Sequence, residues 1–129
     1  MPAVTFHWTL VFTASSLEHL AERDIGADDV ADAVSGRHGP VRVRLHGRGR
    51  QERWFVVAPL DGAELITCVL RAAEPRDLAA DGAFVVPALG LPEEPGAFQE
   101  SMRLCVTGWM SHDDEIKSYR AWRRTKGGR

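Results

Sequence analysis

The sequence has no long apolar run and little cysteine. No stretch approaches the roughly 20 apolar residues that span a bilayer, and the first charged residue is Glu18, so the basic start of a secretory signal is missing. The only two cysteines, Cys68 and Cys105, each lie in an apolar strand-like run, which indicates buried thiols in a reducing compartment. We therefore expect a cytoplasmic protein with no membrane partner.

Signatures of cofactor binding are also missing. The turn from Gly47 to Arg50 lacks the lysine and hydroxyl of a phosphate-binding loop, and neither a CxxC nor an HExxH motif occurs. The five histidines are not spaced like metal ligands. His112 precedes an acid, Asp113, but adjacency in sequence does not give the geometry of a catalytic triad. The sequence accordingly predicts no metal and no other cofactor.

What is present suits one globular domain. The chain has 129 residues, of which 44% are hydrophobic and 26% are charged. Its formal net charge of −2 conceals two basic segments. The first contains Arg37, Arg42, Arg44, Arg48, Arg50 and Arg53, and the second contains Lys117, Arg120, Arg123, Arg124, Lys126 and Arg129. Such segments favour a localised anion-binding face, whereas two solvated surfaces that never meet are the alternative.

Hydrophobic periodicity predicts an α+β fold. Thr5–Thr13 alternates as a half-buried strand, and Ser15 with Glu18 forms a capping box that begins a helix. A second helix begins at Asp28 or Asp29 and ends at Gly36. Further strands are predicted at 41–46, 52–58, 63–70 and 102–109, in a mostly antiparallel sheet of four to five strands. Ser111 with Asp114 forms another capping box, before a final helix that runs to about residue 125.

Residues 72–101 break this regularity, because prolines and glycines recur and only Phe84–Val86 suggests a short strand. Irregular segments of this length are usually lids, binding loops or disordered. We treat 72–101 as an insertion within one domain over 1–129, and 126–129 as a flexible tail.

The second predicted strand carries the first candidate site. Alternation places Arg42, Arg44 and His46 on one face, about 6.6–6.8 Å apart, a spacing close to the phosphate repeat of an extended nucleic-acid strand. The alternative is a solvated outer face, since arginines on an edge strand also discourage aggregation.

The final helix carries a second candidate. A helical period gives an apolar stripe of Ile116, Tyr119 and Trp122, beside a basic stripe of Lys117, Arg120 and Arg124. Cations next to aromatics can hold phosphates and stack on bases. Alternatively, Tyr119 and Trp122 dock the helix on the sheet while the cations favour its C-terminal end.

A third candidate is the pair His19 and Arg23, which lie four residues apart on the first helix and are expected to project together. A histidine beside an arginine has its charged form disfavoured, so it could serve as a base. Two independent surface side chains are the alternative.

Taken with the order of elements, these segments resemble the DUF4258 and BrnT-like group, small bacterial proteins similar to RelE-type toxins of toxin–antitoxin pairs. The front of that pattern matches His19, Arg23, Ile25, Asp29 and Val30, and the back matches Thr107, Glu115, Tyr119 and Arg120. The likeness covers about Thr5–Arg71 and Met102–Arg124. Residues 72–101 depart from it, because compact members of the group have a tight connection there.

The resemblance implies a metal-independent endoribonuclease that cleaves RNA by attack of the 2′-hydroxyl, together with a cognate antitoxin-like protein. Catalysis would fall to His19, Arg23, Arg44 and His46, and RNA binding to Arg42, Arg48, Lys117, Tyr119, Arg120 and Arg124. A catalytically inactive RNA- or protein-binding module of the same fold is the alternative. The oligomeric state stays open, a homodimer being one option.

Overall fold

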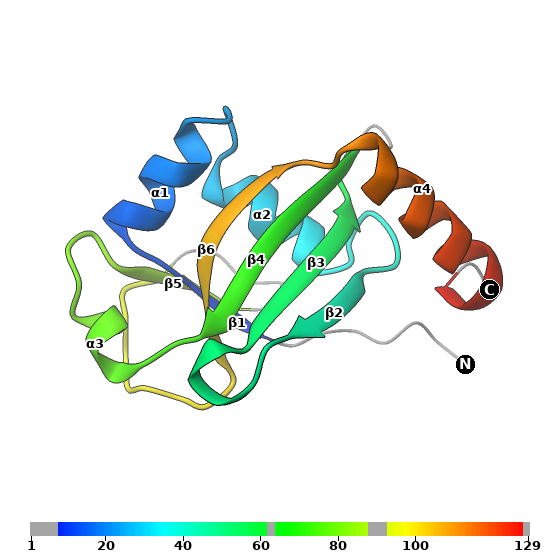
Figure 1. The fold of residues 1–129 in the computed structure, drawn as a ribbon. Coiled ribbons are helices and arrows are strands. Elements are labelled where there is room, and N and C mark those ends of the chain that lie inside the picture. Colours follow the sequence, from blue (N-terminus) through cyan, green and yellow to red (C-terminus); the bar gives the residue numbers. More distant parts are fainter. Residues whose placement is uncertain (1–7, 62–63, 88–92, 128–129) are drawn as a thin grey trace.

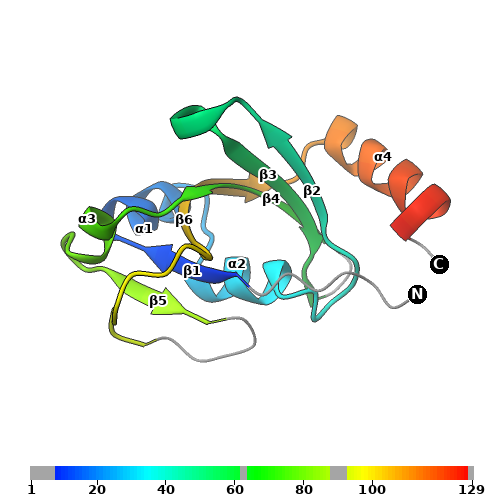
Figure 2. The ribbon, with the colours of Figure 1, turned by 90° about the horizontal axis from the view of Figure 1, so that it is seen from below.

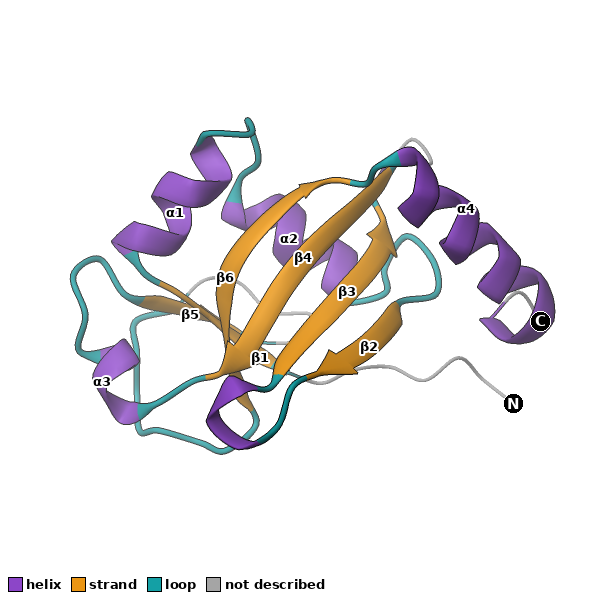
Figure 3. Cartoon of the chain, viewed as in Figure 1, coloured by secondary structure: helices purple, strands orange, loops and turns teal. Residues whose placement is uncertain are grey.

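A computed structural model, which describes residues 8–61, 64–87 and 93–127, has an α+β architecture (Figures 1 and 3). The strands are β1 (Thr9–Phe12), β2 (Arg42–His46), β3 (Arg53–Pro59), β4 (Leu65–Ala72), β5 (Phe84–Val86) and β6 (Met102–Met110). The helices are α1 (Ala14–Ala21), α2 (Ala27–Val34), α3 (Pro75–Leu78) and α4 (Asp113–Trp122), with short turns η1 (Gly49–Gln51) and η3 (Arg123–Gly127).

The strands form one sheet in the order β2-β3-β4-β6-β1-β5. Neighbouring strands are antiparallel except β1 and β6, which are parallel, with Leu10 opposite Arg103. The predicted α+β class and the closing helix are therefore confirmed. The sheet has six strands rather than four to five, because β5 emerges from the region 72–101 and pairs with β1.

Helices α1 and α2 cover the same side of the sheet, which we call the helix face (Figures 1 and 2). The main core lies between them and the strands, and Leu10 and Phe12 share this face of β1 as predicted. The expectation that β1 is half-buried is wrong, because Val11 on its other face is fully buried in a second apolar cluster. Leu20 from α1 and Val30 from α2 are fully buried in the same core. The buried positions contributed by β3, β4 and β6 are Val56, Ala58, Ile66, Cys68, Leu70 and Cys105.

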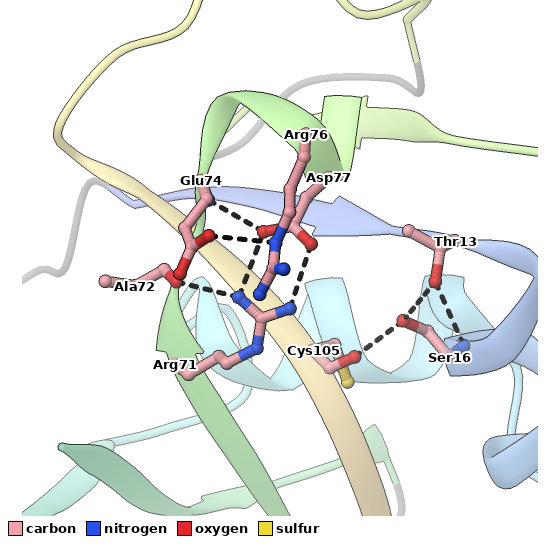
Figure 4. Close-up of polar contacts among 8 residues, drawn as sticks. All are labelled: Thr13, Ser16, Arg71, Ala72, Glu74, Arg76, Asp77 and Cys105. Atoms are coloured by element: carbon pink, nitrogen blue, oxygen red, sulfur yellow. Dashed lines mark hydrogen bonds and ion pairs between the residues drawn. The ribbon is translucent and has the colours of Figure 1, made fainter. Parts of the chain in front are cut away.

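Helix α1 begins two residues before the predicted Ser15–Glu18 box. Thr13 is the N-cap, since its hydroxyl accepts a hydrogen bond from the Ser16 amide at 3.3 Å. The Ser16 hydroxyl donates to the carbonyl of Cys105 on β6 at 2.6 Å, so it is buried against the sheet (Figure 4). Thr13, Ser15 and Ser16 could each cap this helix, and because the Ser16 hydroxyl bonds to the sheet, Thr13 is left as the cap.

The second helix is close to its prediction. Gly26 is the N-cap of α2, and its amide donates to the Asp29 carboxylate at 3.0 Å. After the helix, Gly36 has φ of +80°, a left-handed conformation that favours glycine and stops the helix as expected. Between α1 and α2, Asp24 takes φ of +58°, which aspartate tolerates better than most residues.

Residues 72–101 are more regular than their composition suggests. Within the described part, α3 and β5 form, and the Phe84–Val86 strand is confirmed. A second apolar cluster anchors this region beside β1, with Ala73 and Leu78 against Val11, Val85, Met102 and Leu104. At the other end of the chain, Lys126 and Gly127 of the predicted tail belong to the turn η3, and residues 128–129 lie outside the described residues. Residues 5–7 of the first predicted strand also lie outside them.

None of the described helices combines the length and apolar character needed to traverse a bilayer.

Candidate nucleic-acid interface

The side of the sheet opposite α1 and α2, which we call the open face, carries the β2 cations. Val43 packs against the main core, so Arg42, Arg44 and His46 on either side of it point to the open face. Pairing in β3 places Val57, Phe55 and Arg53 directly opposite them. On β4 and β6 the same face shows Thr67, Val69, Arg71, Leu104, Thr107 and Trp109. The predicted alternation of β2 is thus confirmed.

The two β2 arginines have no anionic partner in the described part of the chain. Arg44 is exposed and Arg42 is half-buried, and neither forms an ion pair or a side-chain hydrogen bond there. Arg48 is exposed just beyond the strand, at the start of the η1 turn. Unpaired guanidinium groups keep all their donors available for an incoming anion.

Aromatic rings lie beside these cations. The His46 ring packs edge-on against Phe55, with centroids 4.9 Å apart and an interplanar angle of 64°. Phe55 is half-buried and faces Arg44 in the register of β2 and β3. Val57 and Val69, in the middle of the open face, are only 6% and 8% exposed. The accessible part of this face is therefore the border along β2, which is cationic and bears one imidazole.

Trp109, at the far side of the open face, is held by the start of α4. Its Nε1 donates to Glu115 Oε1 at 2.9 Å, and the same oxygen accepts from the His112 amide at 2.7 Å. His112 and Glu115 therefore form the capping box, one residue later than the predicted Ser111–Asp114 pair. Ser111 instead exchanges a hydrogen bond with Thr67, 2.8 Å away.

Tyr119 does not serve as an exposed stacking platform, contrary to the RNA-binding role proposed for it. Its side chain is buried, with 2% exposure, and its hydroxyl donates to the carbonyl of Pro40 at 2.6 Å. Burial raises the pKa of Tyr119, against a smaller lowering by the Arg123 charge. The docking alternative is correct for this residue, because an aromatic ring buried under a helix has no face left for a base.

The exposed cations of α4 and of the η3 turn that follows it lie at the end of the sheet where β2 begins. The Tyr119–Pro40 bond brings the helix beside the first residues of β2, as Figures 1 and 2 both show. Lys117, Arg120 and Arg124 are all exposed. Arg120 and Arg123 line a cavity of about 550 Å³ together with His38, Tyr119 and two acids, Asp61 and Glu64. This cavity is not lined by Arg42 or Arg44.

The predicted catalytic quartet is split between the two sides of the sheet. His19 is an exposed residue of α1, and Leu20 next to it packs onto the helix face near Gly108. His46 lies on the open face, so His19 and Arg23 cannot join it in one site. The sequence reveals the helix and the strand but not which side of the sheet each residue occupies. Within the described part of the chain, the Arg23 side chain reaches only the His19 carbonyl, at 3.5 Å.

A cluster of ion pairs lies at the C-terminal end of β4, which is the end of the open face away from α4 (Figure 4). Arg71 binds both carboxylate oxygens of Asp77 at 2.9 Å, and Asp77 also accepts from the Glu74 amide at 2.7 Å. Burial would raise the pKa of Asp77, but the hydrogen bonds from Arg71 and Glu74 and the charges of Arg71 and Arg76 outweigh it and lower the pKa. A cavity of about 650 Å³ lies here, lined by Gly49, Glu52, Arg53, Arg71, Ala72, Glu74 and Arg76.

The two cysteines are not candidate nucleophiles. Both are free and buried, from adjacent strands of the core. Burial raises the pKa of Cys105 to about 12, and burial together with the proximity of Cys105 raises that of Cys68 well above its ordinary value. Thiols held in this form are inert. Among the described residues, no three histidine, cysteine or acidic side chains gather as metal ligands would.

The region 72–101 does not close the β2 border. Among its described parts, Ala73, Leu78 and β5 pack beside β1, at the opposite end of the strand order from β2. Its first residues, Ala72, Glu74 and Arg76, line the cavity that also contains Arg53 and does not include Arg42, Arg44 or His46. The candidate interface therefore consists of Arg42, Arg44, His46, Phe55 and Arg53, and we call it the β2 border. In comparisons with protein-family models, with curated proteins and with solved structures, no match to this chain was found.

Proposed function

We propose that this protein binds single-stranded RNA along the β2 border. The observation that carries the proposal is the pair Arg42 and Arg44, which face the same side as Phe55 and have no acidic partner within the described residues. Two arginines one strand repeat apart, about 6.6–6.8 Å, suit successive phosphates of an extended strand. Phe55 and the His46 ring supply the apolar and aromatic surface on which bases stack.

RNA binding by this border is tested with the Arg42→Ala/Arg44→Ala double variant. As a control of equal charge, Arg23→Ala/Arg37→Ala removes two exposed cations, Arg23 beyond α1 and Arg37 beyond α2. Affinity for a fluorescent single-stranded RNA is measured against salt concentration. We expect the double variant to bind at least tenfold more weakly, with a salt slope smaller by about 1.4, because each phosphate contact contributes about 0.7. Equal affinities of the two variants would refute this assignment.

A second candidate, the metal-independent endoribonuclease toxin, is favoured by the position of His46. This imidazole is the side chain of the β2 border that suits proton transfer near neutral pH, and it lies between Arg44 on its own strand and Arg53 opposite it on β3. Cleavage by the 2′-hydroxyl requires a proton acceptor and cations that stabilise the crowded phosphate. In this assignment His46 accepts the proton of the 2′-hydroxyl as the 2′-oxygen bonds to phosphorus, and it passes the proton to the 5′-oxygen as the bond between that oxygen and phosphorus breaks. Arg44 and Arg53 stabilise the charge, and His19 and Arg23 take no part.

Cleavage is tested with His46→Asn, which keeps a polar side chain but cannot transfer a proton as imidazole does. We expect the rate to fall by about 10²–10⁴-fold while RNA affinity changes little. Chelators should have no effect, a cyclic 2′,3′-phosphate should be released, and His19→Asn should cleave like the unaltered protein. If the unaltered protein binds RNA and leaves it intact, the binding function stands and the toxin assignment fails, and with it the need for a cognate antitoxin-like partner.

A further inference from the structure

Strand β2 is an open edge of the sheet. It is the terminal strand, and among the described residues only β3 pairs with it. The opposite terminal strand, β5, is covered: Val85 and Glu93 exchange two backbone hydrogen bonds, at 2.9 and 2.7 Å. An uncovered edge presents a row of backbone donors and acceptors that a further strand can pair with.

The side chains of β2 divide by chemistry between the two faces. Arg42, Arg44 and His46 face the open face, and Val43 and Leu45 face the helix side. Leu45 is 55% exposed, more than any other large hydrophobic side chain described. An apolar side chain this exposed at the free edge has no neighbour to cover its outer side. An incoming strand would supply that neighbour.

A second copy of this chain is a poor partner for the edge. Antiparallel pairing of two β2 strands about their common centre places Arg44 opposite Arg44 of the other copy and Arg42 opposite its His46. Like charges directly opposite one another in a sheet are destabilising. The arginines thus act against self-pairing, and they select for a strand of opposite charge.

We propose that the free edge of β2 accepts an extended acidic segment of a partner protein as an added strand. Its acidic residues would alternate with apolar ones, the acids facing Arg42, Arg44 and His46, and the apolar side chains covering Leu45 and the edge of Val43. Backbone hydrogen bonds supply affinity in such strand addition, and the alternating side chains supply specificity. The inference goes beyond RNA binding and does not depend on it, although a bound strand and RNA would compete for Arg42 and Arg44.

The test uses the full chain and a synthetic peptide of alternating glutamate and valine, about nine residues long so that it exceeds the five residues of β2. Two control peptides change one property each: the first replaces glutamate with lysine, and the second carries N-methyl groups on alternate amides, which remove hydrogen bonds at unchanged charge. Binding is measured by fluorescence anisotropy, and backbone contact by amide hydrogen exchange of β2.

We expect the acidic peptide to bind at least tenfold more tightly than either control peptide, and to protect alternate amides of β2 from exchange. The Arg42→Glu/Arg44→Glu variant should lose at least tenfold in affinity, while Arg23→Glu/Arg37→Glu should keep it. Equal binding of the N-methylated peptide would show charge attraction without strand pairing and would overturn the proposal, as would dimerisation of the chain through β2 in sedimentation experiments. RNA binding measured separately can succeed or fail without changing these outcomes.

Discussion

The Tyr119 hydroxyl on α4 donates a hydrogen bond to the carbonyl of Pro40, a residue 79 positions earlier in the chain, at 2.6 Å. Pro40 lies two residues before Arg42, the first residue of β2, so this bond links the C-terminal helix to the start of the basic strand. The buried ring of Tyr119 packs against the ring of Trp122, and the ring centroids are 5.6 Å apart. The contact fixes where the exposed cations of α4 lie relative to Arg42.

Replacing Tyr119 with phenylalanine removes this hydroxyl and leaves the Pro40 carbonyl without its donor. We expect unfolding free energy to fall by about 1–2 kcal/mol, because a lost hydrogen bond is aggravated by an unsatisfied acceptor. Denaturant unfolding measures the change. Ser118→Ala, an exposed substitution on the same helix, should change stability little, and a loss of equal size there would contradict the role given to the Tyr119 bond.

The Asp77→Asn substitution weakens the paired contact with Arg71 and the cap of α3. The expected cost is about 2 kcal/mol at neutral pH, as for hydrogen bonds between charged groups of low exposure. Because the folded protein lowers the pKa of Asp77 from its ordinary 3.8, its contribution is present above pH 3.8 and is lost as pH falls through the lower folded value. Unfolding curves of the variant and the unaltered protein should therefore converge in acid.

Arg76 provides the control for that experiment. It pairs with Glu74 at 2.9 Å, but its side chain is 77% exposed. Exposed ion pairs contribute about 0–1 kcal/mol, so Arg76→Ala should have little effect. A destabilisation by Arg76→Ala as large as that of Asp77→Asn would mean that exposure does not distinguish the two pairs.

Gly108 allows α1 to approach the sheet. A methyl group at this position would lie 3.2 Å from Leu20 Cδ2, 3.3 Å from the Thr67 carbonyl oxygen and 3.4 Å from Cys68 Cβ. We expect Gly108→Ala to destabilise the protein by about 1–3 kcal/mol through overpacking. Thermal unfolding measures it, with Gly96→Ala as the control, because nothing lies within 4 Å of a methyl group there. Equal melting temperatures of the two variants would contradict the close packing of α1 on Gly108.

Alkaline pH should weaken the fold through its buried thiols. Cys105 has a folded pKa of about 12 against an ordinary 9.0, so the unfolded chain releases this proton first and stability declines as pH rises from 9 toward 12. One such group contributes a slope of up to about 1.4 kcal/mol per pH unit. Cys105→Ala should flatten the decline by about that amount in unfolding measurements, and Ser118→Ala should leave it unchanged. An identical slope in Cys105→Ala would contradict the assignment.

Local patterns predicted the elements better than their ends. Alternation identified the two faces of β2 correctly, because that strand packs one side on the core and patterning records that burial directly. It predicted a half-buried β1, whereas Val11 on the other face is buried by the region 72–101, whose packing the pattern of β1 does not record. Both helix starts next to hydroxyl-rich stretches were misplaced by one or two residues. Thr13, Ser15 and Ser16 can all cap, and the choice depends on the Ser16 bond to Cys105, which lies 89 positions away.

The sequence predicts which side chains share a face of one strand, but it does not predict whether residues from two different elements lie on the same side of the sheet. Arg42, Arg44 and His46 share a face for local reasons, whereas the separation of His19 from His46 depends on which side of the sheet α1 packs. The Arg71–Asp77 pair was missed. The sequence Glu74-Pro75-Arg76-Asp77 could have indicated it, because a proline at the first helical position followed two residues later by an acid is typical of a helix start.

The place of β1 within the sheet has a consequence for how the chain acquires its structure. Residues 9–12 lie between β5 and β6, the last two strands to be synthesised. β1 therefore has no strand to pair with while the middle of the chain is being made, and the sheet is completed only by contacts between distant parts of the sequence. Such pairing is slow, since loop closure precedes any stabilising contact. A nascent chain that stops before residue 84 contains neither of the strands that pair with β1, so Leu10 and Phe12 lack their neighbours in the sheet.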